Sequence, residues 1–193
     1  MKDNYGFIKL FFKILWLAII LVAGYFLFFS NPIKKYDSQI PERFINSYDK
    51  KAPVELMNMT FYYTDGISLI PEDRKVGISD NPEVLAGNVL TEYMKGSEDT
   101  DLYLPLPEKA EIRNFFFKDG TLFLDFSREI KVNFDGGVGA ELCCLYGFVN
   151  TLSEINAIKE VRFLLNGEDP EVLISHIYTG NALKRDEDLI QKF

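Results

Sequence analysis

Residues 112–127, IRNFFFKDGTLFLDFS, decide the fold of this chain. At their centre lies Asp119-Gly120, a two-residue loop of the kind that favours a type I′ turn between two strands. The sequence therefore predicts an antiparallel hairpin whose register pairs Phe115 with Leu124, Phe116 with Phe123 and Phe117 with Leu122.

The two faces of this hairpin differ in composition. Successive side chains of a strand point to opposite faces, so we expect one face to join the core through Phe115, Phe117, Leu122, Leu124 and Phe126. The other face is mixed and carries Phe116 and Phe123. If no other layer covers this aromatic pair, it forms a patch suited to a protein interface. The alternative is that the tether or the C-terminal tail covers it.

Further elements flank the hairpin. Residues 56–63 and 67–78 lie on either side of a turn signal and predict a second hairpin. Asn81-Pro82 predicts the start of a helix that ends near Gly96. The remaining expected elements are a nearly all-apolar helix over about 140–154, a strand over 160–165 and an edge strand within 171–180. The order β-β-α-β-β-α-β predicts an α+β fold, with one mainly antiparallel sheet of about five strands and two helices on one face.

The N-terminal part of the chain carries a long apolar run. Residues 10–29 are broken only by Lys13, and about 20 apolar residues suffice for a membrane-spanning helix. A cleaved signal peptide is the alternative, but no Ala-x-Ala-like site follows the run. Tyr25 stands where a lipoprotein would need its Cys. The flanking lysines give a slight preference for an N-terminus inside the cell.

The predicted layout therefore has five segments. They are a cytoplasmic tail over 1–9, a transmembrane helix over 10–29, a tether over 30–55, one domain over 56–180 and a charged tail over 181–193. We expect residues 184–193 of this tail to be frayed.

Composition excludes several kinds of site. A net charge of −8 repels nucleic acid. The only cysteines, Cys143 and Cys144, are adjacent and give no disulfide framework, so we expect two small apolar side chains in a buried helix. Since His176 is the only histidine, the sequence predicts no metal site.

Few residues could perform catalysis. A hydrolase needs two converging carboxylates. We expect Asp125 instead to support the backbone at the end of its strand, and Glu72 to form a surface ion pair with Arg74. Only His176 could complete a Ser-His-Asp set, and we expect it to be solvated or satisfied. The glycine-rich segment 136–139 lacks the Lys and Ser/Thr of a phosphate-binding loop. We therefore predict no catalytic, cofactor-binding or metal-binding residues.

Seven short motifs, in order and at matching spacing, resemble the GerMN domain family. They are Leu69-Ile70-Pro71-Glu72 with Arg74, Met94-Lys95-Gly96, Leu104 with Pro107, Asp119-Gly120, Leu124-Asp125-Phe126-Ser127, Val149-Asn150-Thr151-Leu152 and Val161-Arg162-Phe163-Leu164-Leu165-Asn166-Gly167. The resemblance covers about residues 56–180. It implies a bacterial extracytoplasmic domain without established catalytic residues, used in envelope complexes of sporulation or germination.

Together these observations predict a non-enzymatic, single-pass protein of the bacterial cytoplasmic membrane, with its C-terminal domain outside. The expected partners are the membrane through residues 10–29 and other envelope proteins or a second copy, with Phe116 and Phe123 as the partner surface. The alternative is a cell-wall-binding or accessory module that positions a peptidoglycan hydrolase. A hydrolase in its own right is the third hypothesis.

Overall fold

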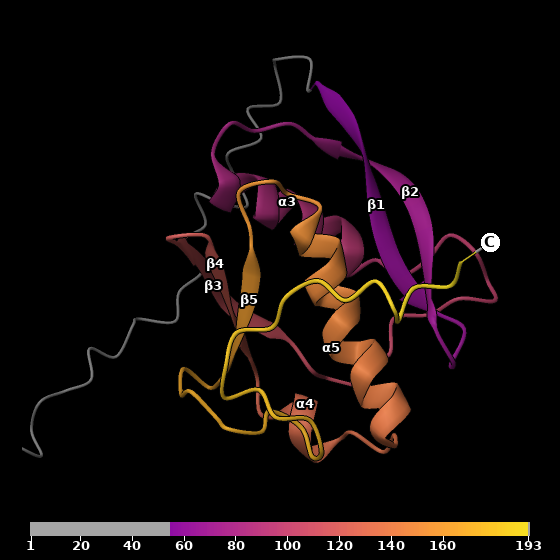
Figure 1. Ribbon diagram of the computed structural model, residues 1–193, viewed down its shortest axis with the longest axis vertical. Helices are drawn as coiled ribbons and strands as arrows, with labels where there is room; N and C mark the ends of the chain where they lie inside the picture. The colour runs from indigo at the N-terminus through magenta and orange to yellow at the C-terminus, as the bar shows by residue number, and fades with distance from the viewer. Residues whose placement is uncertain (1–54, 193) are drawn as a thin grey trace, which may run out of the picture. The chain divides into compact units, whose positions relative to one another are not determined.

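The computed structural model describes residues 55–192. In chain order, the helices and strands are β1 (Leu56–Thr64), β2 (Leu69–Gly77), α3 (Pro82–Tyr93), β3 (Ile112–Lys118), β4 (Thr121–Phe126), α4 (Glu129–Val132), α5 (Val138–Ser153) and β5 (Glu160–Leu165) (Figure 1). The predicted transmembrane helix over 10–29 lies outside the described residues. Within residues 55–192, no helix has the length and apolar character needed to cross a bilayer.

The hairpin around Asp119-Gly120 forms as predicted. Phe116 pairs with Phe123 and Phe117 with Leu122 in the antiparallel ladder of β3 and β4. Asp119 and Gly120 both have positive φ angles, 51° and 87°, as a type I′ turn requires. Leu122, Leu124 and Phe126 are fully buried, and the partly buried Phe115 and Phe117 pack against the same core. The predicted core face is therefore confirmed.

The prediction of one mainly antiparallel sheet is wrong. β1 and β2 form an antiparallel two-stranded sheet, and β3, β4 and β5 form a separate sheet in which β5 runs parallel to β4. The parallel pair follows from the connection, because a crossover through a helix such as α5 allows the chain to re-enter the sheet in the same direction. The short helix α4 was not predicted either. The coarser expectation of an α+β fold holds.

Side chains explain why the two sheets do not join. The outward amide of Tyr62 in β1 donates to the Thr151 hydroxyl of α5 at 3.1 Å. The carbonyl of Tyr62 accepts a bond from the Tyr93 hydroxyl of α3 at 2.7 Å. Helix α5 lies between the sheets in Figure 1, and it occupies the edge of β1 where another strand would have paired.

The predicted helices form with nearly the expected ends. The side chain of Asn81 accepts bonds from the amides of Glu83 and Val84 at the start of α3. Gly96 follows α3 with a φ of 85°, a conformation that favours glycine. Helix α5 is buried along most of its length, as its apolar sequence predicts.

A glycine allows α5 to approach β1 closely. A Cβ atom on Gly147 would lie 2.4 Å from the Tyr93 hydroxyl and 3.2 Å from the Tyr62 carbonyl oxygen. Both atoms belong to the hydrogen bond that closes the edge of β1. A side chain at position 147 would therefore displace a bonded, buried tyrosine.

We expect Gly147→Ala to destabilise the domain by about 1–3 kcal/mol, the usual penalty for overpacking a core. Gly139→Ala in the same helix is the matched control, because open space surrounds its added Cβ. Its effect should be neutral or stabilising, by up to about 1 kcal/mol. Urea denaturation of both variants measures the difference, and equal stabilities would contradict the role of Gly147.

The C-terminal segment does not fray as expected. Residues 181–192, which we call the strap, cross from β5 over α5 to β2. Leu183 exchanges two backbone bonds with Val161 of β5, each 2.8 Å long. At the far end, the amide of Leu69 donates to Leu189 at 2.8 Å, and the amide of Gln191 donates to Leu69 at 2.9 Å. The preceding residues 171–180 form no strand, only an isolated bridge between Val172 and Tyr178.

Candidate functional site

The predicted partner surface lies on the outer face of the three-stranded sheet. The rings of Phe116 and Phe123 stack with centroids 4.4 Å apart and planes 7° from parallel. Both are half-buried, and neither belongs to the core cluster. The register places Arg162 of β5 beside Phe123, and Asp169 holds this guanidinium by two bonds of 2.9 and 2.6 Å. We call Phe116, Phe123 and Arg162 the aromatic face.

The aromatic face has the chemistry of a binding surface. Aromatic and Arg side chains are enriched at the centres of protein interfaces. Since stacking fixes the two rings and Asp169 fixes the guanidinium, little side-chain entropy would be lost on binding.

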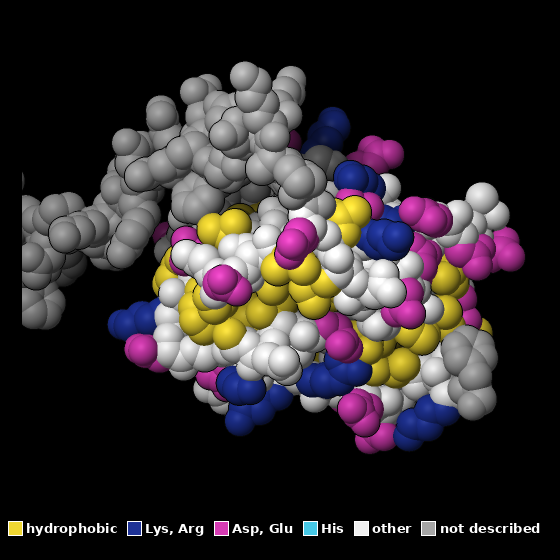
Figure 2. Space-filling model, turned by 90° about the horizontal axis from the view of Figure 1, so that it is seen from above, with side chains coloured by type: hydrophobic (Ala, Val, Ile, Leu, Met, Phe, Trp, Pro, Cys, Tyr) yellow, Lys and Arg dark blue, Asp and Glu magenta, His cyan; other side chains and the backbone are white. Residues whose placement is uncertain are grey.

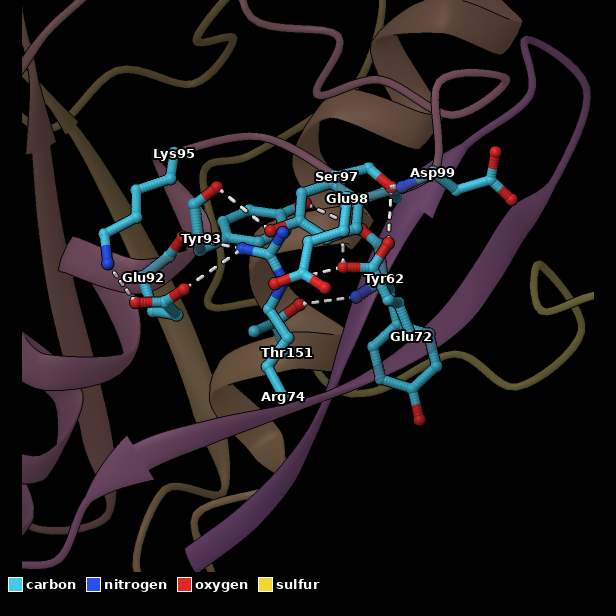
Figure 3. A network of polar contacts seen from close by, with 11 residues as sticks. Tyr62, Glu72, Arg74, Glu92, Tyr93, Lys95, Ser97, Glu98, Asp99 and Thr151 are labelled. Carbon is cyan, nitrogen blue, oxygen red and sulfur yellow. Dashed lines mark hydrogen bonds and ion pairs between the residues drawn. The ribbon is translucent and has the colours of Figure 1, made fainter. Parts of the chain in front are cut away.

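The candidate carboxylate Glu72 belongs to a polar network around Arg74 (Figure 3). The Nε atom of Arg74 lies 2.6 Å from Glu72, and its Nη1 lies 3.3 Å from Glu92 at the end of α3. Arg74 is only 8% exposed, and its guanidinium lies 5.4 Å from the ring centroid of Tyr63. The expectation of a surface ion pair is therefore wrong, because the pair is largely buried.

The environment of Glu72 favours its charged form. Burial alone would raise the pKa of this carboxyl, but bonds from the Ser97 hydroxyl, the Glu98 amide and Arg74 together lower it. An ionised carboxylate with three donors is already satisfied. The network joins β2 to the residues that follow α3 and stabilises this part of the fold.

Asp125, the other candidate carboxylate, supports a turn. Its Oδ1 atom accepts a 2.8 Å bond from the amide of Gly167, and Arg113 lies 3.6 Å from its Oδ2 atom. Asn166 and Gly167 both have positive φ angles, 53° and 80°, at the turn that ends β5. The two candidate carboxylates thus lie in different sheets with separate partners, and they do not form a catalytic pair.

One cluster, formed by Glu141, Ser175 and His176, was not predicted from the sequence. Glu141 is fully buried in the first turn of α5 and accepts bonds from the backbone amides of Ser175, His176 and Ile177. The Ser175 hydroxyl and a Glu141 oxygen lie 2.7 and 2.9 Å from the same ring atom, Nδ1 of His176. A catalytic triad needs the serine and the carboxylate at opposite ring nitrogens, so the cluster anchors residues 173–179 instead. A lone carboxylate in an apolar helix was its only sequence signal.

Glu141 should make stability depend on pH. Burial alone would raise its pKa, but the hydrogen bonds from residues 175–177 outweigh burial and lower the pKa below the ordinary value. Its stabilising contribution is therefore complete above the unfolded-state pKa of about 4.3 and is lost as the pH falls through the lower folded-state pKa.

We expect Glu141→Gln to cost about 1–3 kcal/mol at pH 7, because the amide cannot accept every donor that the carboxylate accepts. The difference from the unchanged protein should shrink as the pH falls below the unfolded-state pKa of about 4.3. Urea denaturation across this range measures it, with the exposed Glu108→Gln as control. Other carboxylates with lowered pKa values, such as Glu72, make the same pH-dependent contribution to the stability of both proteins, so their effect is removed by the comparison. A difference that does not change with pH would contradict this role.

The cysteines and the glycine-rich segment, the remaining candidate groups, are packed within the domain. Both cysteines are buried, and burial raises the pKa of the Cys144 thiol to about 12, which agrees with the expected apolar role. In the glycine-rich segment before α5, a Cβ on Gly136 would meet Ala140 at 2.7 Å, so this glycine serves close packing. Among residues 55–192, no group of His, Cys, Asp and Glu is placed to hold a metal ion.

Within residues 55–192, several strand edges already form hydrogen bonds. Glu83 of α3 accepts a bond from the Phe117 amide at 2.9 Å on the outer edge of β3. The strap forms backbone hydrogen bonds with Val161 of β5 and Leu69 of β2. Tyr103 pairs in the same way with Thr64 at the end of β1. Strand addition would first have to displace these groups.

The fold and its motif residues define a GerMN-related domain. The family model described as Germane, sporulation and spore germination, matches residues 60–171, more than half of the chain. The chain therefore belongs to this family, and the resemblance inferred from its motifs is confirmed. A search of curated proteins finds no match.

Solved structures share the fold at low sequence identity. The first GerMN domain of the sporulation protein GerM from Bacillus subtilis is 18% identical with a TM-score of 0.50, over 67% of this chain and 98% of that one. The tandem GerMN domains of the same protein are 16% identical with a TM-score of 0.51, over 67% of this chain and 46% of that one. The chain thus spans about half of the tandem. A protein of Clostridium perfringens, described provisionally as a lipoprotein, is 18% identical with a TM-score of 0.50, over 70% of this chain and 93% of that one.

Proposed function

We propose that this protein is a non-enzymatic, membrane-anchored component of the bacterial cell envelope, whose GerMN-related domain assembles with other envelope proteins or with itself. The aromatic face is the observation that carries the proposal. Its stacked Phe116 and Phe123, half-buried and outside the core cluster, offer a preorganised apolar surface. Membership of the sporulation and spore germination family suggests that the complex serves one of these processes.

The surroundings of the candidate catalytic groups support a non-enzymatic role. Glu72, Asp125 and Glu141 each accept bonds that stabilise local structure. The one histidine has its Nδ1 atom directed at Glu141, and both thiols are buried. Binding through a surface needs none of these groups to be accessible.

The proposed location is the cytoplasmic membrane, with residues 10–29 as a single span and the domain outside. The apolar sequence of this segment supports the span. Anchoring would confine the domain to two dimensions and raise its effective concentration for assembly. A lipoprotein description for a structural relative agrees with a membrane-associated domain.

The closed strand edges favour assembly through side chains over strand addition. The bonds at Phe117, Val161, Leu69 and Thr64 already use backbone groups that an added strand would need. A side-chain surface such as the aromatic face requires no such rearrangement.

Substitution of both phenylalanines by Ser tests the proposal and its cell-wall alternative. We expect full-length Phe116→Ser/Phe123→Ser to remain folded but to co-purify with fewer envelope proteins from native membranes. Leu56→Ser is the control, because this exposed leucine lies in β1, in the other sheet. Purified full-length protein should not sediment with peptidoglycan. Sedimentation that the double substitution abolishes would assign the aromatic face to the cell wall instead, and unfolding of the double variant would place both rings in the core.

A further inference from the structure

The turn between β1 and β2 carries an apolar side chain with no packing role in the domain. Ile67 is 88% exposed, the highest value among the large exposed hydrophobic residues of the described chain. It follows Asp65-Gly66, in a loop where strand pairing has already ended at Thr64 and Leu69. The fold does not need a β-branched residue at this position, because loops of this kind favour polar residues and glycine.

Hydrogen bonds hold the loop in one conformation. The Asp65 carboxylate accepts bonds from the amides of Ile67 and Ser68 at 2.8 and 2.9 Å. The Thr64 hydroxyl donates to the Ser68 carbonyl at 2.8 Å and accepts from the Gly66 amide at 3.0 Å. The exposed side chain therefore projects from an ordered turn, and fixing it against a partner would cost little backbone entropy.

A second exposed apolar side chain lies against the same turn. Tyr103 exchanges two backbone bonds with Thr64, of 3.0 and 2.9 Å, and is 49% exposed. Its hydroxyl would lie 3.3 Å from a Cβ added to Gly66, so the ring rests over this glycine. Ile67 and Tyr103 together form an apolar projection, which we call the hairpin tip.

The segments that carry the hairpin tip are acidic. Residues 64–68 and 97–106 contain Asp65, Glu98, Asp99 and Asp101 but no Lys or Arg. On the face that Figure 2 shows, Asp and Glu side chains are interspersed with Lys and Arg. In the two segments that carry the hairpin tip, by contrast, every charged side chain is acidic, and all four carboxylates are exposed. An anionic lipid surface would repel such a segment, and two copies of the tip would repel each other.

We infer that the hairpin tip is a second binding surface, which inserts Ile67 into an apolar pocket rimmed by Lys or Arg on another protein. The inference rests on the proposed role in assembly and adds a surface with different residues from the aromatic face. An apolar anchor surrounded by charges that match the partner is the usual arrangement of an interface centre and its rim.

The geometry of β1 separates the hairpin tip from the point where the tether enters the domain. β1 begins at Leu56 and ends at Thr64, and a strand of this length spans roughly 26–30 Å at about 3.3 Å per residue. The tip therefore lies at the opposite end of β1 from Leu56, where the tether joins the domain.

Site-specific photocrosslinking of the full-length protein in its native membranes tests the inference. We expect a photoreactive residue at position 67 to give one discrete protein adduct. The same residue at position 78 should give none, because Ile78 is 47% exposed but lies beyond the other end of the hairpin. The charge reversal Glu98→Lys/Asp101→Lys should reduce the adduct at position 67 by about tenfold, since opposed rim charges attract the partner. The double substitution of the aromatic face should leave contact at position 67 detectable, which separates this inference from the proposed function.

A second sample distinguishes other occupants of the tip. The purified full-length chain in phosphatidylglycerol-containing nanodiscs should give no adduct at position 67. A lipid adduct there, or an adduct with a second copy, would overturn the inference. Equal adducts at positions 67 and 78 in native membranes would also overturn the inference. So would an adduct at position 67 that the charge reversal leaves unchanged.

Discussion

Ending the chain after Leu183 should destabilise the domain by about 5 kcal/mol or more, because several buried groups lose their partners together. Asn150 of α5 is fully buried, and its side chain exchanges bonds of 2.8 and 3.0 Å with the backbone of Asp186. Each unsatisfied buried polar group costs about 1–3 kcal/mol, and typical domains have only about 5–15 kcal/mol of stability.

The strap also covers apolar surface. Leu189 and Ile190 pack on the small cluster of Tyr62, Leu69 and Cys143. Arg185 binds Glu154 at 2.7 Å and the Tyr62 hydroxyl at 2.7 Å. Loss of the strap should therefore expose the Cys143 thiol, whose reaction rate with a thiol reagent measures the opening directly.

A chain that ends after Gln191 is the matched control. It loses the ion pair of Lys192 with Asp188, which spans 3.8 Å between two exposed side chains and should contribute little. Urea denaturation of the full chain and both truncated forms compares their stabilities. Equal stability of the two truncated forms, or no change in Cys143 reactivity, would show that the strap does not support the fold.

Arg74→Met should lower the free energy of unfolding by about 3 kcal/mol, near the lower end for a buried ion pair that loses one partner. Glu72 and Glu92 would then keep their charges without the guanidinium between them. Arg74→Lys should recover only part of the loss, because an ammonium group cannot reproduce the directed bonds of a guanidinium.

The matched control for Arg74 is Arg113→Met. Arg113 lies 3.6 Å from Asp125 but is more exposed than Arg74, so its loss should cost less than about 1 kcal/mol. Thermal and urea denaturation measure both variants. If the two arginines gave the same change in stability, burial of the Arg74 network would have no energetic consequence.

The local structure of the fold could be predicted from sequence because its signals are short-range. The Asp119-Gly120 turn and the alternation around it specify the β3–β4 register, and Asn81-Pro82 specifies the start of α3. The division into two sheets could not be predicted. It depends on Thr151 and Tyr93, which are far from Tyr62 in sequence and bond its backbone groups.

The family motifs explain what the sequence could and could not reveal about the site. Glu72 and Arg74 join β2 to the residues after α3, and Asp125 fixes the turn at Asn166-Gly167. The bonds of these motif residues thus stabilise the fold. The pairing of Phe116 with Phe123 was predictable from strand alternation. The strap and the Glu141 cluster were not, because they depend on contacts between distant residues, such as Asn150 with Asp186 and Glu141 with Ile177.

The size of the native complex is the most direct test of the proposed assembly role. We predict that the full-length protein, extracted from native membranes in mild detergent, has a mass well above that of one chain of 22.2 kDa with its micelle. Phe116→Ser/Phe123→Ser should lower this mass while the protein stays folded. An identical mass for both proteins would contradict assembly through the aromatic face.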